Sequence, residues 1–236
     1  MIPDVRWYDS VPSTMDVAAA LAAEGAAHGV VVAAHQQTAG RGRRGSAWLS
    51  PPGAGLYFSV IARRTPALSL LTLACGVGVR EGIAAASGLQ ADLKWPNDLL
   101  VGRRKLAGIL AEGIGIGTPE QAVIVGVGVN LRPAAYPPDV AARATSIEGE
   151  LGRPVDRDAV LAAILGALSA RLAALDQNAG DILQAWRAAS PSAVGARVAW
   201  DGHRGVTAGI DATGALLVTT ASGVERIIAG ELHWSL

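Results

Sequence analysis

The chain has 236 residues, half of them hydrophobic, which is enough for one sizeable core and a small second module. Its twenty basic and twenty acidic residues cancel, so the protein as a whole offers no general attraction for nucleic acid. The single cysteine, Cys75, excludes a disulfide framework. The N-terminus has no signal-peptide pattern, and the longest apolar stretch, Leu68–Val79, stops at Arg80, so neither export nor membrane insertion is indicated. A reducing, cytoplasmic compartment is therefore expected.

The N-terminal third alternates strands and helices around one long loop. Ser13-Thr14-Met15-Asp16 has the spacing of a helix cap and predicts a helix that runs to about Glu24. The segment Gln36–Ala54 is rich in glycine and arginine and contains Pro51-Pro52, which predicts a long loop and makes it a functional candidate. Strands are predicted over Val5–Tyr8, Val30–Val32 and Leu56–Ala62, and a core helix over Ala67–Ala86.

The central part predicts a hairpin, a further strand and two helices. The strand Ala122–Leu131 carries alternate glycines, Gly126 and Gly128, which indicate the close approach of a neighbour or a ligand. Asp156 is a candidate cap for the first of the two helices. The hairpin is predicted over Leu93–Val101 and Lys105–Glu112, and the helices over Asp156–Leu175 and Asp181–Ala189.

After Pro191 the chain changes to short strands divided by Gly-containing turns, a spacing that favours a small all-β barrel. Strands are predicted over Arg197–Trp200, Val206–Ile210, Leu216–Thr220 and Glu225–Ile228. We therefore predict an α+β protein with a mixed sheet, divided into a catalytic domain over residues 1–190 and a β domain over residues 191–236.

Lysine is unusually scarce in this chain. Eighteen of the twenty basic residues are arginine, and the only two lysines are Lys94 and Lys105. A chain so biased to arginine is expected to keep lysine where a compact, movable ammonium is needed in place of a planar fork. The alternative is that two surface lysines survived by chance, which composition alone does not exclude.

The loop Gly40-Arg41-Gly42-Arg43-Arg44-Gly45 matches the glycine spacing of a dinucleotide-binding loop, but it leads toward a Pro-Pro pair and a strand, and not into a helix. Its arginines instead suggest a flexible lid whose guanidinium groups neutralise a triphosphate and the pyrophosphate that leaves. A solvated loop and a contact with nucleic-acid phosphates are the alternatives.

Two further motifs contain the lysines. Lys94-Trp95-Pro96-Asn97-Asp98 combines a cation, an amide and a carboxylate around a rigid turn, which could hold phosphate through Lys94 and Mg²⁺ through Asp98. Lys105 begins a strand three residues before Gly108, where an ammonium could stabilise charge between a carboxylate and an α-phosphate. Ordinary turn chemistry and a strand-edge lysine are the alternatives.

Taken in order, these blocks closely resemble the signatures of biotin protein ligases (biotin–acetyl-CoA-carboxylase ligases). The blocks are Gln37 to Gly45 with Trp48, Lys94 to Asp98, Lys105 to Leu110, and Gly126 to Leu131. The resemblance implies an SH2-like catalytic domain followed by an SH3-like barrel. It also implies an ATP- and Mg²⁺-dependent ligase that forms biotinyl-AMP and transfers biotin to a lysine of a biotin carboxyl carrier protein.

The resemblance also implies roles for individual residues. Trp48 would pack on the ligand, and Gly108, Gly126 and Gly128 would leave room for it. Arg132–Glu148 would form a loop on the adenine side, in which no residue is assigned to stack on adenine. The implied catalytic residues are Lys105, Arg41 and Arg43, and Asp98 is the implied metal ligand. The implied biotin-binding residues are Ser13, Thr14, Gln37, Gly40, Arg41, Gly42, Arg43, Trp48, Lys105, Gly108, Gly126 and Gly128. The implied ATP-binding residues are Arg43, Arg44, Trp48, Lys94, Asn97, Asp98, Lys105 and Asn130.

Some biotin protein ligases carry an N-terminal DNA-binding domain, but only a dozen residues precede Ser13. We therefore expect a ligase without repressor activity, acting as a monomer or homodimer with no nucleic-acid or membrane partner. A lipoate ligase or acyl transferase on a similar scaffold, and a nucleic-acid-binding module that uses the arginine loop, are the alternative functions.

Overall fold

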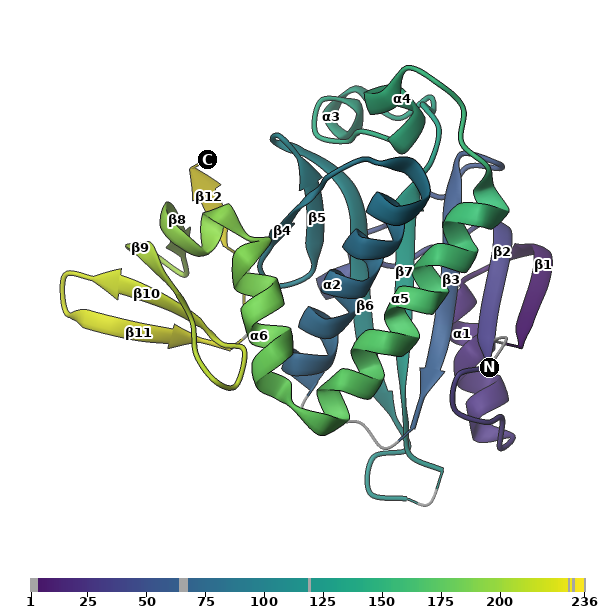
Figure 1. Ribbon diagram of the computed structural model, residues 1–236, viewed down its shortest axis with the longest axis horizontal. Coiled ribbons are helices and arrows are strands. Elements are labelled where there is room, and N and C mark those ends of the chain that lie inside the picture. Colours follow the sequence, from purple (N-terminus) through teal and green to yellow (C-terminus); the bar gives the residue numbers. More distant parts are fainter. Residues whose placement is uncertain (1–3, 64–67, 119, 229, 231, 236) are drawn as a thin grey trace.

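The computed structural model describes residues 4–63, 68–118, 120–228, 230 and 232–235. Within these ranges a seven-stranded mixed sheet has the order β1-β2-β3-β7-β6-β5-β4, and a five-stranded antiparallel sheet has the order β11-β10-β9-β8-β12 (Figure 1). The first sheet contains β1 (Val5–Val11), β2 (Val31–Gln37), β3 (Gly55–Ala62), β4 (Asp92–Lys94), β5 (Asp98–Val101), β6 (Arg104–Ile114) and β7 (Ala122–Asn130). The second contains β8 (Val194–Trp200), β9 (His203–Ile210), β10 (Leu216–Thr220), β11 (Gly223–Ile227) and β12 (His233–Ser235).

Helices cover both faces of the seven-stranded sheet (Figure 1). The helices are α1 (Thr14–Ala23), α2 (Leu68–Ser87), α3 (Pro138–Ala141), α4 (Ile147–Leu151), α5 (Arg157–Gln177) and α6 (Ala179–Ala188). Helix α1 packs on one face with Met15 and Ala18 against Val32 and Ile124, whereas α2, α5 and α6 form the larger core on the other face. Strands β3 and β7 are buried along their whole length, because both faces of the sheet are covered at its centre.

The predicted caps of α1 and α5 are confirmed, whereas α6 begins at Ala179 and not at Asp181, and the predicted helix start at Ala67 lies outside the described residues. Ser13 caps α1 by accepting a hydrogen bond from the Met15 backbone N–H, and Asp156 caps α5 by accepting from Asp158 and Ala159. By length and composition alone, two helices, Leu70–Ser87 and Arg157–Gln177, could each cross a membrane. The sequence pattern indicated only the shorter apolar stretch Leu68–Val79 and did not predict this. In the fold α2 and α5 are neighbours in the helical layer, and both contribute apolar side chains to the core, as helices of a globular protein do.

Three details differ from the sequence prediction. The run Leu93–Val101 is not one strand, because Trp95-Pro96-Asn97 forms a turn that separates β4 from β5. The segment after β7 contains the short helices α3 and α4, which no periodic pattern indicated. The described C-terminal strands form an open sheet with β11 and β12 at its edges, so the predicted closed barrel is not seen, and β12 itself was not predicted.

The C-terminal sheet is fixed to the rest of the molecule near the end of β4. The buried Trp95 Nε1 donates to the carbonyl oxygen of Gly214 at 3.0 Å, and Arg187 of α6 donates to the carbonyl oxygen of Ile210 at 2.8 Å. Lys94 Nζ also lies 5.4 Å from the ring centre of Trp234 in β12. These contacts place β12 beside the motif that contains Lys94.

Candidate active site

One cavity of about 860 Å³ opens where the glycine-rich loop, α1 and strands β4 to β7 meet. All of the predicted site residues line it except Gly40 and Asn130. Motifs from four separate parts of the chain therefore share one site. The predicted residues at the cavity are Ser13, Thr14, Gln37, Arg41, Gly42, Arg43, Arg44, Trp48, Lys94, Asn97, Asp98, Lys105, Gly108, Gly126 and Gly128.

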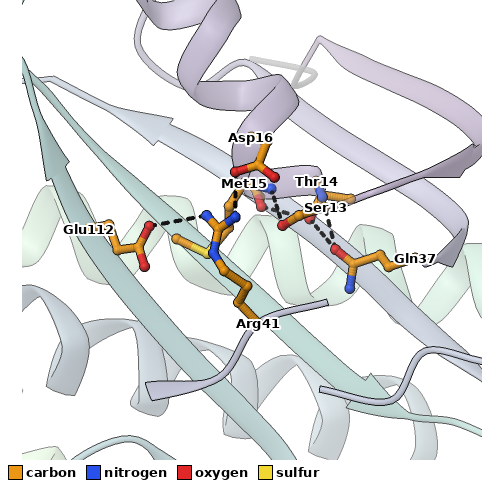
Figure 2. Close-up of polar contacts among 8 residues, drawn as sticks. Ser13, Thr14, Met15, Asp16, Gln37, Arg41 and Glu112 are labelled. Atoms are coloured by element: carbon orange, nitrogen blue, oxygen red, sulfur yellow. Dashed lines mark hydrogen bonds and ion pairs between the residues drawn. The ribbon is translucent and has the colours of Figure 1, made fainter. Parts of the chain in front are cut away.

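The end of the cavity beside α1 is neutral and hydrogen-bonded. Gln37 Oε1 accepts from the Thr14 backbone N–H at 2.9 Å and from Thr14 Oγ1 at 3.1 Å (Figure 2). Gln37 Nε2 donates to Ser50 Oγ at 2.8 Å. Thr14 Oγ1 also lies 2.8 Å from the buried Ser59 Oγ. Such paired donors and acceptors without charge suit a neutral polar group that has both N–H and C=O functions.

The glycine-rich loop folds back on itself as a small hairpin. The Gly42 N–H donates to the carbonyl oxygen of Ser46 at 2.6 Å, and the Trp48 N–H donates to that of Gly40 at 2.8 Å. A Cβ at Gly40 would lie 2.5 Å from the Trp48 carbonyl oxygen, so only glycine fits there. Gly40 therefore shapes the loop without lining the cavity.

The two predicted catalytic arginines have different surroundings. Arg43 is half-buried, its Nη1 approaches Asn97 Oδ1 at 3.5 Å, and burial lowers its pKa because its charge is partly desolvated, a cost that an anionic ligand would offset. Arg41 instead donates to Asp16 Oδ1 and to Glu112 Oε2, and the hydrogen bond to Asp16 is the largest cause of its raised pKa (Figure 2). The charge of Arg41 is thus already matched by two carboxylates of the protein.

Trp48 lies directly on the sheet. A Cβ at Gly128 would lie 2.4 Å from its indole ring, and one at Gly108 would lie 3.1 Å from it. In this conformation the glycines make room for Trp48, and a Cβ at Gly126 would meet Met15. Trp48 Nε1 is buried with no hydrogen-bond partner among the described residues, so it is a donor available to a ligand.

The opposite end of the cavity is cationic. Lys105 Nζ lies 2.6 Å from Asp98 Oδ1 and 5.2 Å from the ring centre of Trp48. The pKa of Lys94 is lowered, first because burial penalises its charged form and also because Lys105 is near, although Asp98 opposes the shift. Phosphate oxygens would relieve that repulsion, so the surroundings of the two lysines suit a polyphosphate.

Asn130 is buried behind the cavity and not in its wall. Its Nδ2 donates to the carbonyl oxygens of Lys105 at 3.3 Å and Thr145 at 2.9 Å, and its Oδ1 accepts from Tyr136 at 3.4 Å. This arrangement orients the backbone of Lys105, which also pairs with Ala144. Asn130 therefore holds the strand that positions Lys105, and its contact with ATP stays a prediction.

Several lining residues were not predicted. Arg103 lies in the turn between β5 and β6. Arg143 lies beside Lys105, because the backbone N–H of Lys105 donates to the carbonyl oxygen of Arg143 at 2.7 Å. His233 and Trp234 come from β12. The closeness of Arg103 to Lys105 in the sequence was a usable signal, whereas nothing local marks β12 as part of the site.

A neutral hydrogen-bonding recess that continues into a lysine- and arginine-lined cavity, on a mixed sheet, is an arrangement that suits a ligase that activates an organic acid with a nucleoside triphosphate. The profile of the Biotin/lipoate A/B protein ligase family matches residues 7–130. The chain belongs to this family.

Named relatives extend the similarity over nearly the whole chain. The biotin–[acetyl-CoA-carboxylase] ligase of Paracoccus denitrificans is 35% identical over 86% of this chain and 89% of the relative. The bifunctional ligase/repressor BirA of Bacillus subtilis is 33% identical over 96% of this chain and 73% of the relative. The structure of the biotin protein ligase from Aquifex aeolicus in complex with biotin and ATP has a TM-score of 0.84 and 28% identity, over 98% of each chain.

Proposed function

We propose that this protein is an ATP-dependent biotin protein ligase. In the first step a carboxylate oxygen of biotin attacks the α-phosphorus of ATP, which forms biotinyl-AMP and releases pyrophosphate. In the second step the amine of a carrier lysine attacks the acyl carbon, which forms an amide and releases AMP. The observation that supports this best is the single cavity, in which the neutral Thr14–Gln37 recess and both lysines of the chain lie together.

The residues divide between the two ends of the substrate. Ser13, Thr14 and Gln37 fit the ureido ring, which needs donors and acceptors without charge. Lys105 is the group that stabilises negative charge where the carboxylate meets the α-phosphate, and Arg43 and Lys94 hold the remaining phosphates. Trp48 covers the intermediate and keeps water from the mixed anhydride.

Magnesium enters this proposal as the partner of the triphosphate. Among the described residues no three His, Cys, Asp or Glu side chains come together as a ready-made metal site. Asp98 is the carboxylate at the cationic end of the cavity, and Mg²⁺ is commonly held by one or two carboxylates together with substrate phosphates. Asp98 therefore suits a metal that arrives with ATP, which would screen charge on the phosphates.

Biotin-dependent exchange between ATP and pyrophosphate tests the first step. The wild-type protein is expected to catalyse it, and Lys105→Ala to reduce it by about 100-fold or more, because preorganised charge at the reacting centre is lost. Arg104→Ala is the matched control, since this neighbouring cation is exposed and pairs with Glu150 at 2.8 Å. Exchange that needs lipoate or octanoate in place of biotin would overturn the substrate assignment.

The remaining expectations belong to the same proposal. The acceptor is a biotin carboxyl carrier protein of an acyl-CoA carboxylase, no nucleic acid takes part, and the protein acts in the cytoplasm as a monomer or homodimer. The change from helices to short strands after Ser190 supports a catalytic domain over residues 1–190 and an SH3-like β domain over residues 191–236. The five short antiparallel strands support that comparison.

A further inference from the structure

Arg41, in the glycine-rich loop, is bound to two other parts of the protein. Its Nη1 donates to Asp16 Oδ1 in the first turn of α1, and its Nη2 donates to Glu112 Oε2 in β6 at 3.3 Å (Figure 2). The two carboxylates are 25 and 71 residues away in the sequence. One planar guanidinium thus joins three separate segments around the cavity, which a lysine could not do with the same geometry.

The contact of Arg41 reaches the ligand-facing residues through the hairpin of the loop. Arg41 pairs with Ala47, and the hydrogen bond from Gly42 to Ser46 closes the strands between them. The hairpin contains both Arg43 and Trp48. Fixing Arg41 therefore fixes the positions from which Arg43 approaches Asn97 and Trp48 lies on Gly128.

We propose that Asp16 and Glu112 are positioning residues that hold the glycine-rich loop closed over the cavity through Arg41, and so retain biotin and the acyl-adenylate. This inference rests on the proposed function. All three side chains are partly exposed, from 37% for Arg41 to 51% for Asp16. Exposed ion pairs are individually weak, so the two together shift a loop equilibrium by a factor of about ten. That is enough to change ligand retention without changing the fold.

The test compares the double variant Asp16→Asn and Glu112→Gln with the wild type in biotin-dependent ATP–pyrophosphate exchange. The KM for biotin is expected to rise about five- to tenfold, with kcat within about twofold, because the loop still closes but less often. Without acceptor protein, release of biotinyl-AMP into solution should rise by a similar factor. A double variant with Asp16→Glu in place of Asp16→Asn keeps the charge at this position, so its KM and release rate should return most of the way to the wild-type values.

A double-mutant cycle separates positioning from a general structural effect. Adding Arg41→Gln to the double variant should raise the KM no further, because all three side chains act through one contact. Asp4→Asn, which removes an exposed partner of Arg6 at 3.0 Å, should leave KM and release unchanged.

Two outcomes would overturn the proposal. One is a KM and release rate that are unchanged in the double variant. The other is a further rise in the KM for biotin when Arg41→Gln is added to the double variant. If wild-type protein showed no biotin-dependent exchange, the proposed function would fail first, and the two failures are therefore distinguishable. Equal melting temperatures of variants and wild type would confirm that folding is intact.

Discussion

Two buried glycines of β7 meet different neighbours, and this difference predicts different tolerance to a methyl group. A Cβ at Gly128 would lie 2.4 Å from the rigid indole of Trp48, whereas one at Gly126 would lie 2.7 Å from the sulfur of the flexible Met15. Gly128→Ala should displace Trp48 and raise the KM for biotin and ATP about tenfold or more. Gly126→Ala should change KM by a few-fold at most.

A second-site change checks that Trp48 is the cause. Trp48→Phe places a smaller ring over β7, so it should recover part of the KM lost in Gly128→Ala while raising the KM of the wild type. Steady-state exchange kinetics of the single and double variants measure the coupling. Equal effects of Gly126→Ala and Gly128→Ala, or additive effects of Gly128→Ala and Trp48→Phe, would contradict this account.

For individual residues, the sequence predicted which of them belong to the site better than it predicted what each one does there. From motif order and the scarcity of lysine it could be predicted that Lys94, Lys105 and Gln37 share one site, and in the structure all three line the same cavity. The roles of Arg41 and Asn130 depend on partners distant in the chain, namely carboxylates on α1 and β6 and the carbonyl oxygens of Lys105 and Thr145. Local patterns contain no information about such partners.

Helices α2 and α5 approach each other closely at glycines of α2. A Cβ at Gly82 would lie 2.3 Å from the Cα of Ile164, which is backbone and cannot turn away as a side chain could. Gly82→Ala should therefore force the helices apart and destabilise the protein by about 1–3 kcal/mol or more. Gly166 lies at an exposed position of α5 where a Cβ meets nothing within 4 Å, so Gly166→Ala should stabilise the protein by about 0.5–1 kcal/mol.

Urea unfolding of both variants measures these opposite signs, and the buried Cys75 gives an independent probe of the core. Cys75 lies in α2, and burial raises the pKa of its thiol to about 12. At pH 8 the native thiol is protonated and inaccessible, so it should react with a thiol reagent only when the core opens. Reaction should be faster in Gly82→Ala than in the wild type. A Gly82→Ala variant as stable as the wild type would show that the helices can separate freely.

Local signals determined which elements could be predicted. Helix caps at Ser13 and Asp156 and the apolar runs of β3 and β7 were readable because each depends on neighbours in the sequence. Helices α3 and α4 and strand β12 have three to five residues each, too few to produce a period. Their structure depends on tertiary contacts such as the pairing of β12 with β8.

For the whole molecule, the arrangement of charge matters more than its sum. The net charge is zero, yet the described residues that line the cavity include seven lysines and arginines and the single carboxylate of Asp98. The cations are Arg41, Arg43, Arg44, Lys94, Arg103, Lys105 and Arg143. Even after Asp16 and Glu112 neutralise Arg41 and Asp139 pairs with Arg143, the described cations of the cavity outnumber its carboxylates. Composition could not reveal this, because it depends on which residues the fold brings together.

This concentration of charge predicts that ATP binding depends on salt more than biotin binding does. ATP has several negative charges, whereas biotin has one and binds through its neutral ring as well. Between roughly 0.1 M and roughly 1 M KCl the screening length falls from about 10 Å to about 3 Å, so the KM for ATP should rise several-fold more than that for biotin. Arg103→Ser, which removes an exposed cation at the mouth of the cavity, should reduce the salt dependence of ATP binding with little effect on biotin. Equal salt dependence for both substrates would mean that the positive lining does not bind the nucleotide.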